Sequence, residues 1–568
     1  MKKKNLFLSL ICSIILTIAL VTFTVISIVP KKNNAGTNTP STNVSDPTTD
    51  TDEPAVDITI NDDRDGSEEK PYIIYSADAF KAFVVDKYVD ENGKYIDYTK
   101  VGEDGELVYP LLNAGLHYEL DRDIDFAGTE LTTLFNKGVA FNGHIDGKGF
   151  ALKNITIAVT AENIAAMMNE QVSALGVKSF DVNVAIFGNV DGATFKNVKF
   201  DAVSITVADD VLGLDYINEF NKTFGGSLNQ ITVAPIATFA NNSTFEDVVV
   251  NSTVDAGVYA RYAKTETGDS SKVQGANATS GFVAIAEGCT INKLTVKTDL
   301  TVDQGKNFFV GGAFGYVYDS SVKLANVEVS VKSNYKQALY IGGFAGYALG
   351  LDLDESIIAL NATEASEERF APQGAGTVYA DSDYTWVAGI VNVIRANDET
   401  QKTTINNVSV KSNVDIDAIF AGAVIEVRNA DYGSGDANGD GVNEGAEAIV
   451  GKEKLVTFTD VVIDSEVNTL KAYGFARRLV LTSVTLKSSE CGVDAAGNEY
   501  NLRLVGNIKL SYVNANGEYK MKVAHVFALE SYESNLEGGI STIKGVVSAS
   551  ILGKVVSIAQ FNKYCVVV

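Results

Sequence analysis

The most specific chemical motif in the sequence is an acidic, glycine-rich stretch from Asp436 to Glu447. Its spacing fits the calcium-loop pattern D-x-N-x-D-G-x5-E, in which hard oxygen atoms surround the ion. Two features depart from the usual form: Asn443 occupies a position that is normally apolar, and no helical pattern precedes the loop. We expect calcium as a structural brace here, and the alternative is an acidic loop that bulges between repeats. The predicted ligands are Asp436, Asn438, Asp440, the carbonyl group of Val442, Glu444 and Glu447.

Residue types that support catalysis are sparse and scattered. No histidine or cysteine lies in a metal-binding or nucleophile motif, and no phosphate-binding loop is present. These residues are His117, His144 and His525, with Cys12, Cys289, Cys491 and Cys565. The sequence therefore predicts no catalytic residue and no cofactor-binding residue, and a non-enzymatic protein is favoured.

Acidic groups occur without the basic partners that enzymes acting on polysaccharides place beside them. We interpret these acids as solvated loops or corners. The single tryptophan, Trp386, is interpreted as packing rather than as a platform for a sugar ring. The acidic groups are Asp121, Asp123 and Asp125, then Asp209 and Asp210, and finally Asp352, Asp354 and Glu355.

A six-residue phrase recurs along the chain: apolar, any, polar or small, apolar, any, apolar. The last two apolar positions are two apart, as in a strand, whereas the first two are three apart, so the phase slips once. A strand that bends at a corner produces this pattern, with all three apolar residues facing one interior. The copies begin at Leu152, Phe195, Phe245, Ile291, Leu324, Ile405, Phe458 and Leu481, with a weak copy at Ile357.

Asparagine or aspartate often occupies the slip, because these side chains tolerate unusual backbone angles. They are predicted to align as a polar ladder along one corner, and the alternative is a set of independent turn residues. The residues concerned are Asn154, Asn197, Asp247, Asn326, Asn407 and Asp460.

A glycine-containing phrase precedes many copies, as in Gly311 to Gly315 and Gly342 to Gly346, and indicates tight corners or close backbone approach. The uneven intervals suit a solenoid with loops that grow outward, rather than a propeller of regular blades or a β-sandwich. The predicted fold is all-β, a right-handed parallel β-helix. Turns of about 20–25 residues predict roughly twenty coils and a rod on the order of 90–100 Å long.

The N-terminus predicts export. Three lysines precede an apolar run over residues 6–29, which is long enough to span a bilayer, so residues 1–30 are predicted to form an uncleaved signal anchor. A cleaved signal peptide is the alternative. Residues 31–70 are rich in Thr, Ser, Asn, Asp, Pro and Glu, which is typical of a disordered acidic linker.

The remaining chain divides into a cap, a stack and an end. Residues 71–126 are predicted to cap the solenoid with a short helix that begins after Ser76. Residues 127–494 should form the β-helix repeats, with two helical insertions over 161–175 and 211–224, and residues 495–568 should form C-terminal coils or a cap.

Three segments in this order resemble the entry segment of bacterial surface β-helix proteins with GLUG-type repeats: Tyr72 to Phe83, Leu120 to Phe126 and Phe141 to Ile155. The glycine phrases resemble those repeats as well, and the resemblance covers roughly residues 71–410. It implies an exported solenoid, often adhesin-like, and supplies no catalytic residues.

The formal net charge of −26 argues against nucleic acid as a partner, because phosphates would be repelled. It also argues against electrostatic adhesion to an anionic membrane, which leaves residues 6–29 as the membrane contact. The sequence therefore predicts an extracytoplasmic, membrane-tethered surface protein for adhesion to a surface glycan or protein ligand, or for cell-envelope structure. The alternative is a polysaccharide lyase or glycoside hydrolase on the same scaffold. Composition does not fix the oligomeric state.

Overall fold

The computed structural model shows a predominantly β protein with parallel sheets of many strands, which confirms the predicted fold class at that level and is consistent with a β-helix-like fold. The predicted anchor at 6–29 and the predicted calcium loop lie outside the described residues. Within the part that the structure describes, no helix is long and apolar enough to cross a membrane. The described residues are 61, 63–85, 111–129, 131–136, 139–172, 178–208, 211, 225–259, 277–304, 308–333, 339–364, 385–396, 402–416, 418–429, 456–468, 471–473 and 476–480, with six strands between Leu502 and Val567.

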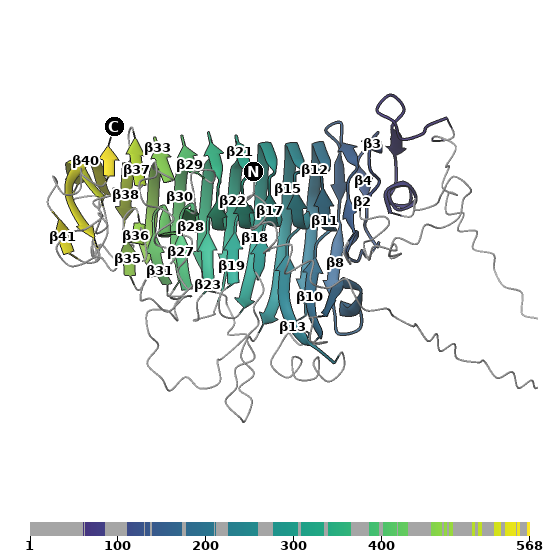
Figure 1. The fold of residues 1–568 in the computed structure, drawn as a ribbon, viewed down its shortest axis with the longest axis horizontal. Helices are drawn as coiled ribbons and strands as arrows, with labels where there is room; N and C mark the ends of the chain where they lie inside the picture. Colours follow the sequence, from purple (N-terminus) through teal and green to yellow (C-terminus); the bar gives the residue numbers. More distant parts are fainter. Residues whose placement is uncertain are drawn as a thin grey trace, which may run out of the picture.

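Three sheets run along the molecule, which Figure 1 shows as rows of arrows along the long axis. Sheet 1 contains β1 (Tyr72–Ile74), β3 (His117–Leu120), β4 (Ile124–Asp125), β6 (His144–Asp146), β7 (Ala151–Lys153), β8 (Thr156–Val159), β12 (Thr194–Val207), β15 (Thr244–Tyr259), β18 (Thr290–Gln304), β21 (Ser321–Lys323), β22 (Asn326–Lys332), β25 (Asp352–Asp354), β26 (Ile357–Thr363), β29 (Thr403–Asn406), β30 (Ser409–Asp415), β33 (Val456–Thr459), β34 (Val462–Asn468), β37 (Leu502–Val505), β38 (Lys509–Val513) and β42 (Cys565–Val567).

Sheets 2 and 3 complete each coil. Sheet 2 contains β2 (Leu111–Leu112), β5 (Ala140–Phe141), β11 (Phe187–Asp191), β14 (Ala237–Asn241), β17 (Val283–Glu287), β20 (Phe314–Tyr318), β24 (Ala345–Leu349), β28 (Val391–Ala396), β32 (Val424–Asn429) and β36 (Ala476–Val480). Sheet 3 contains β9 (Met168–Val172), β10 (Lys178–Val184), β13 (Ser227–Val233), β16 (Ala278–Ser280), β19 (Phe308–Gly311), β23 (Leu339–Gly342), β27 (Thr385–Ala388), β31 (Ala418–Ala421) and β35 (Lys471–Tyr473).

One coil passes through sheet 3, sheet 2 and then sheet 1. The coil that begins with β19 bends at a glycine corner into β20, turns into β21, bends again and continues as β22. Each strand pairs in parallel with its counterpart in the next coil, as β19 does with β23 and β20 with β24. The result is a stack in which every side-chain position recurs along the axis.

The number of coils is about half that predicted. Among the described residues, the longest parallel ladder runs in sheet 1 from β1 to β42 and contains twelve strands, so the stack spans on the order of 50–55 Å rather than the length expected for twenty coils. The reason is the size of each coil: the contact from Cys289 to Ser320 in the next coil spans 31 residues, and that from Asn407 to Asp354 spans 53. A coil with segments in three sheets needs more chain than the predicted 20–25 residues.

Apolar side chains fill the interior as columns of equivalent residues. The rings of Phe195 and Phe245 stack in parallel with centroids 5.2 Å apart, and Phe245 meets Phe282 edge-on at 4.9 Å. All three rings are fully buried. Stacking of like residues on successive coils therefore gives one continuous core along the rod.

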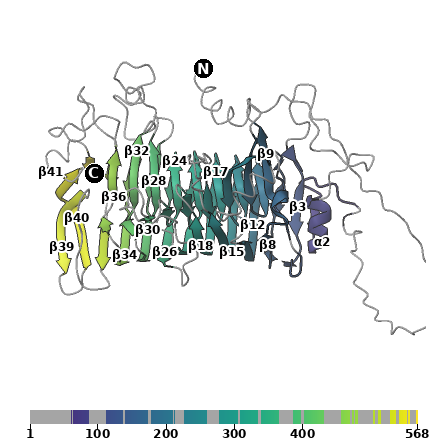
Figure 2. The same ribbon diagram turned by 90° about the horizontal axis from the view of Figure 1, so that it is seen from below.

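A short helical turn covers the N-terminal end of the stack, as Figure 2 shows. The helix α2 (Ala77–Phe80) begins after Ser76, whose side chain accepts a hydrogen bond from the backbone N–H of Ala79. This bond confirms that Ser76 is the N-cap of the helix. The chain continues as the π-helical η2 (Lys81–Val85). Phe80 and Val84 are buried, and the Phe80 ring packs edge-on against Phe126 at 5.5 Å. The helix thus shields the first coil from water.

Described residues upstream of this helix, within the stretch whose composition predicts a linker, also contact the stack. The Asn61 side chain bonds both the N–H and the carbonyl group of Ile73. The carbonyl oxygen of Gly66 accepts a hydrogen bond from the backbone N–H of His117. These contacts attach residues 61–70 to β1 and β3.

The predicted helix at 161–175 is wrong. Only Ile164–Met167 is helical, as a short 3-10 turn called η3, and the chain then forms β9. β9 pairs antiparallel with β10 and thereby covers the edge of sheet 3, so pairing outweighs the helical spacing. Met167 and Met168 are buried, as their interpretation as packing residues requires. Most of the second predicted helix, at 211–224, lies outside the described residues.

A small antiparallel sheet lies at the other end of the molecule, in yellow in Figures 1 and 2. It is formed by β39 (Phe527–Asn535), β40 (Ile540–Ile551) and β41 (Lys554–Val556). The parallel stack ends in β37, β38 and β42 beside it.

Candidate functional site

The recurring phrase folds as a bend with left-handed backbone geometry. One residue per coil has a positive φ between 49° and 59°, and strand register places these residues above one another. We call this set the corner column; it consists of Asn197, Asp247, Lys293, Leu324, Glu355, Asn407 and Asp460.

The polar-ladder prediction is correct for four of its six residues. Asn197, Asp247, Asn407 and Asp460 belong to the corner column. Asn154 also has a positive φ, but it bonds Asp125 at a different corner, and Asn326 begins the straight strand β22. The column is thus continuous in backbone geometry, while lysine, leucine and glutamate replace Asn or Asp in three coils.

Two copies of the phrase are assigned in the wrong register. The structure buries Val322, Ala325 and Val327 in one coil, so the Leu324 side chain points outward and is 43% exposed. In the next coil Leu353, Ser356 and Ile358 face inward, and Ile357 is 59% exposed. Both errors arise because an exposed apolar residue stands where other coils carry a polar one. The copy at 481–486 lies outside the described residues.

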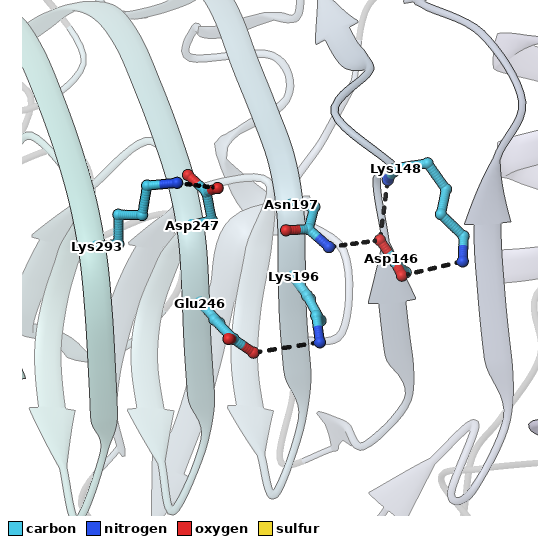
Figure 3. Close-up of polar contacts among 7 residues, drawn as sticks. All are labelled: Asp146, Lys148, Lys196, Asn197, Glu246, Asp247 and Lys293. Carbon is cyan, nitrogen blue, oxygen red and sulfur yellow. Dashed lines mark hydrogen bonds and ion pairs between the residues drawn. The ribbon is translucent and has the colours of Figure 1, made fainter.

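Ion pairs join neighbouring coils beside the corner column (Figure 3). Lys196 pairs with Glu246 at 3.4 Å, Lys293 pairs with Asp247 and the Asn197 amide bonds Asp146 at 3.2 Å. The paired groups are substantially exposed, so each pair adds at most about 1 kcal/mol. They connect the side chains of adjacent coils at the surface.

The acidic groups that the structure describes lie at bends or on short strands and contact neighbouring residues. Asp123 bonds Lys153 and the N–H of Ala151, and the bond from Lys153 lowers the pKa of Asp123. Asp125 accepts the Asn154 amide, which lowers its pKa. These partners tie adjacent coils, so the acids have structural contacts that account for their positions. Asp209 and Asp210 lie outside the described residues.

The third set of acids, Asp352, Asp354 and Glu355, also contacts residues of neighbouring coils. The Thr404 hydroxyl donates to Asp352, and the Asn407 amide donates to Asp354 at 3.1 Å. Lys323 pairs with Glu355 at 3.1 Å and approaches Asp354 at 3.7 Å. Of these acids, only Glu355 lies at the bend, whereas Asp352 and Asp354 lie on strand β25, and Lys323 is a basic partner that the sequence pattern does not indicate.

A second group of aromatic rings lies outside the main core, between the outer faces of sheets 2 and 3. Phe309 of β19 contacts Tyr316 of β20 with centroids 4.9 Å apart, and it stacks on Tyr340 of the next coil at 4.7 Å. We call this set the outer aromatic cluster; it consists of Phe309, Tyr316, Tyr318, Tyr340, Tyr347 and Trp386. Trp386 is only 6% exposed, which confirms its interpretation as a packing residue.

A carboxyl group sits at the margin of this cluster. Glu287 at the end of β17 is the register partner of Tyr318 in the next coil. Burial, followed by the nearby charge of Asp319, raises the pKa of Glu287. Burial also raises the pKa of Tyr318, with Tyr316, Tyr347 and Glu287 acting in the same direction and Arg395 opposing them.

This arrangement provides features that a site for an extended ligand requires: half-buried rings, a carboxyl group whose pKa is raised by burial, and the cation of Arg395 nearby. Sequence reasoning missed it, because the rings come from five strands on successive coils, and Glu287 and Arg395 come from two more. The alternation of Tyr316 and Tyr318 along one strand is the only local indication that these rings share a face.

The remaining reactive residue types are placed as follows. Cys289 is buried as a free thiol, and burial raises its pKa to about 11, so it is not a nucleophile at neutral pH. His117 and His144 lie side by side on sheet 1, and burial, followed by His117, lowers the pKa of His144.

The predicted calcium ligands, from Asp436 to Glu447, lie outside the described residues, between the end of β32 and the start of β33. Over the residues that are described, no group of three or more His, Cys, Asp or Glu side chains could hold a metal ion.

Replacing Leu324 with asparagine should stabilise the protein by about 0.5–1 kcal/mol. Left-handed geometry strains a leucine backbone, whereas asparagine adopts it readily and occurs at the same place in other coils. The measurement is the free energy of unfolding in urea. Ile357→Asn is the control, since the Ile357 side chain is also apolar and exposed, but its backbone lies on the extended strand β26. An equal gain in both variants would show that removing surface hydrophobicity, not backbone strain, is responsible.

Glu287→Gln should stabilise the protein at pH 7 and have little effect near pH 4. The folded-state pKa of Glu287 is raised, so the unfolded chain loses this proton first and the carboxylate costs stability as pH rises above about 4.5. Urea midpoints of the variant and the wild type should converge toward low pH. Glu246→Gln, which removes an exposed carboxylate paired with Lys196, is the control and should give no such gain. A destabilised Glu287→Gln at pH 7 would contradict the assignment.

No protein-family model matches the chain, and no curated protein matches it. The functional assignment therefore rests on the geometry of the coils and on the composition of the sequence.

Proposed function

We propose that the protein is a membrane-tethered, extracytoplasmic surface protein, and that its coils form a right-handed parallel β-helix for adhesion to a ligand or for cell-envelope structure. The observation that carries this proposal is the single continuous stack of in-register coils (Figure 1). Such a stack is a stiff support with repeating, solvent-facing positions, which suits display of a binding surface at a distance from the cell. The right hand follows the strong preference of parallel crossover connections.

The sequence before the stack supports the location. Lysines at 2–4 followed by the apolar run over 6–29 favour an anchor with the stack outside the cytoplasm. The part of the polar stretch before Asn61, about 30 residues, could reach roughly 100 Å if extended, enough to hold the coils away from the membrane. The resemblance of residues 71–410 to GLUG-type surface proteins agrees with this location.

The alternative function is cleavage of a polysaccharide. The specific observation in its favour is Glu287, whose raised pKa suits a general acid, beside the rings of the outer aromatic cluster and near Asp319. A surface glycan is the ligand that both functions share, and a protein ligand fits adhesion alone, so binding and cleavage must be measured together.

The decisive experiment is glycan-array binding run beside cleavage assays on the same polysaccharides. An adhesin should bind one class of glycan and release no product, and Glu287→Gln should change at most the strength of binding. Product release that Glu287→Gln abolishes would replace adhesion with the enzymatic alternative. Failure to bind any glycan or isolated surface protein would leave only the structural role in the envelope.

We also propose that Asp436, Asn438, Asp440, Val442, Glu444 and Glu447 bind calcium as a brace between β32 and β33. The support is the oxygen-donor spacing in the sequence, which satisfies each required position of a calcium loop. Tying down a long connection between two strands would lower the entropy of the chain that leaves the stack and returns to it.

Calcium should raise the melting temperature relative to a chelator, because an ion that binds only the folded state stabilises it by about 2.7 kcal/mol at roughly one hundred times its Kd. Asp440→Ala should remove this increase. Asp431→Ala is the matched control, since it removes an acid just before the loop and should keep the increase. Melting temperatures that are identical with calcium and chelator would exclude the brace.

A further inference from the structure

Two of the three histidines in the chain meet on adjacent coils. His117 of β3 and His144 of β6 are register partners in sheet 1, and their rings stack with centroids 4.5 Å apart and planes 28° apart. Both side chains are half-buried on the same face of the sheet. A parallel pair at the strand spacing of about 4.8 Å brings two imidazoles within reach of one ion.

The ring nitrogens are available. Over the residues that the structure describes, no group forms a hydrogen bond with either imidazole ring, and none of the ring nitrogens is sealed from solvent. The backbone groups are engaged separately: His117 donates its N–H to Gly66, and His144 donates to Leu116. The backbone therefore holds the two residues in register, while the side chains remain able to rotate and the ring nitrogens accept no hydrogen bond from the described residues.

We propose that His117 and His144 form a two-imidazole site for a divalent transition metal of the Cu²⁺, Ni²⁺ or Zn²⁺ class. Neutral imidazole is a preferred ligand for these ions, and hard cations such as calcium prefer oxygen. An imidazole nitrogen binds a metal in the plane of its ring, so binding requires both side chains to rotate out of the stack and direct one nitrogen of each at the shared ion.

The surroundings set the character of the site. No third His, Cys, Asp or Glu among the described residues completes a metal cage, so water fills the remaining positions and the affinity is lower than that of a closed structural site. Glu68 lies close enough to act electrostatically on His144, and its negative charge favours a bound cation.

The consequence is a link between the N-terminal cap and the stack. β3 pairs with β1 on one side and with β6 on the other. An ion held by both histidines joins the strand next to the cap to the following coil. Binding thus stabilises the end of the rod at which the N-terminal segment enters.

The test is titration of the full-length protein with Cu²⁺ at pH 7.5, with excess calcium and magnesium present to occupy acidic surface groups. We expect one equivalent with an electron paramagnetic resonance spectrum of two nitrogen ligands. His144→Gln and His117→Gln should each lower the affinity at least tenfold. His525→Gln is the matched control and should leave the affinity unchanged, as should Asp440→Ala, which belongs to the predicted calcium loop.

A urea unfolding curve of each variant, recorded in the presence of a chelator, shows whether the metal-free variant is folded. A folded His144→Gln protein with unchanged copper affinity would overturn the proposal, and so would loss of binding in His525→Gln. This readout is independent of glycan binding, so the metal site and the adhesive function stand or fall separately.

Discussion

The structure depends on the close approach of successive backbones at the corner between sheets 3 and 2. A β-carbon on Gly343 would lie 2.3 Å from the carbonyl oxygen of Gly389 in the next coil, and one on Gly312 would lie 2.1 Å from that of Gly343. Because both partners are backbone, no side-chain rearrangement relieves such a contact. Glycine lets the coils approach to hydrogen-bond distance, with the N–H of Gly343 2.9 Å from the carbonyl oxygen of Ala388. This column fixes the axial repeat that all other ladders follow.

A fixed axial repeat leaves the outer connections free to vary. The connection from sheet 1 to the next coil needs only to return to the same register, and a longer loop costs little extra closure entropy. At the tight corners, hydroxyl groups supply bonds that the strands lack: Ser320 accepts the N–H of Cys289, and Thr403 accepts that of Leu351. Coils of very different length therefore stack without a break in the core.

The sequence predicts the parallel stack because its apolar pattern records which side chains face inward, as between Phe195 and Phe200, where all three apolar residues are buried. It fails at Leu324, because the pattern does not distinguish an inward apolar residue from one at an exposed bend. It overestimates the number of coils, since spacing along the chain does not show how many strands one turn contains. The outer aromatic cluster is unpredictable for a related reason. Phe309 and Trp386 both contact the ring of Tyr340, and they do so only because the coils stack.

Glu287 bears on the choice between display and chemistry. A carboxylate removed from water beside tyrosine rings and near Asp319 lowers stability at neutral pH, whereas the acids of the corners are compensated by lysine or amide partners. A surface used only for display has no physical requirement for such a group, because a neutral residue would pack there at lower cost. A ligand that places a hydroxyl group or a cation beside Glu287 would offset the penalty on binding. The cost of this one carboxylate is thus the strongest physical reason to look for the ligand at the outer aromatic cluster rather than along the charged corner.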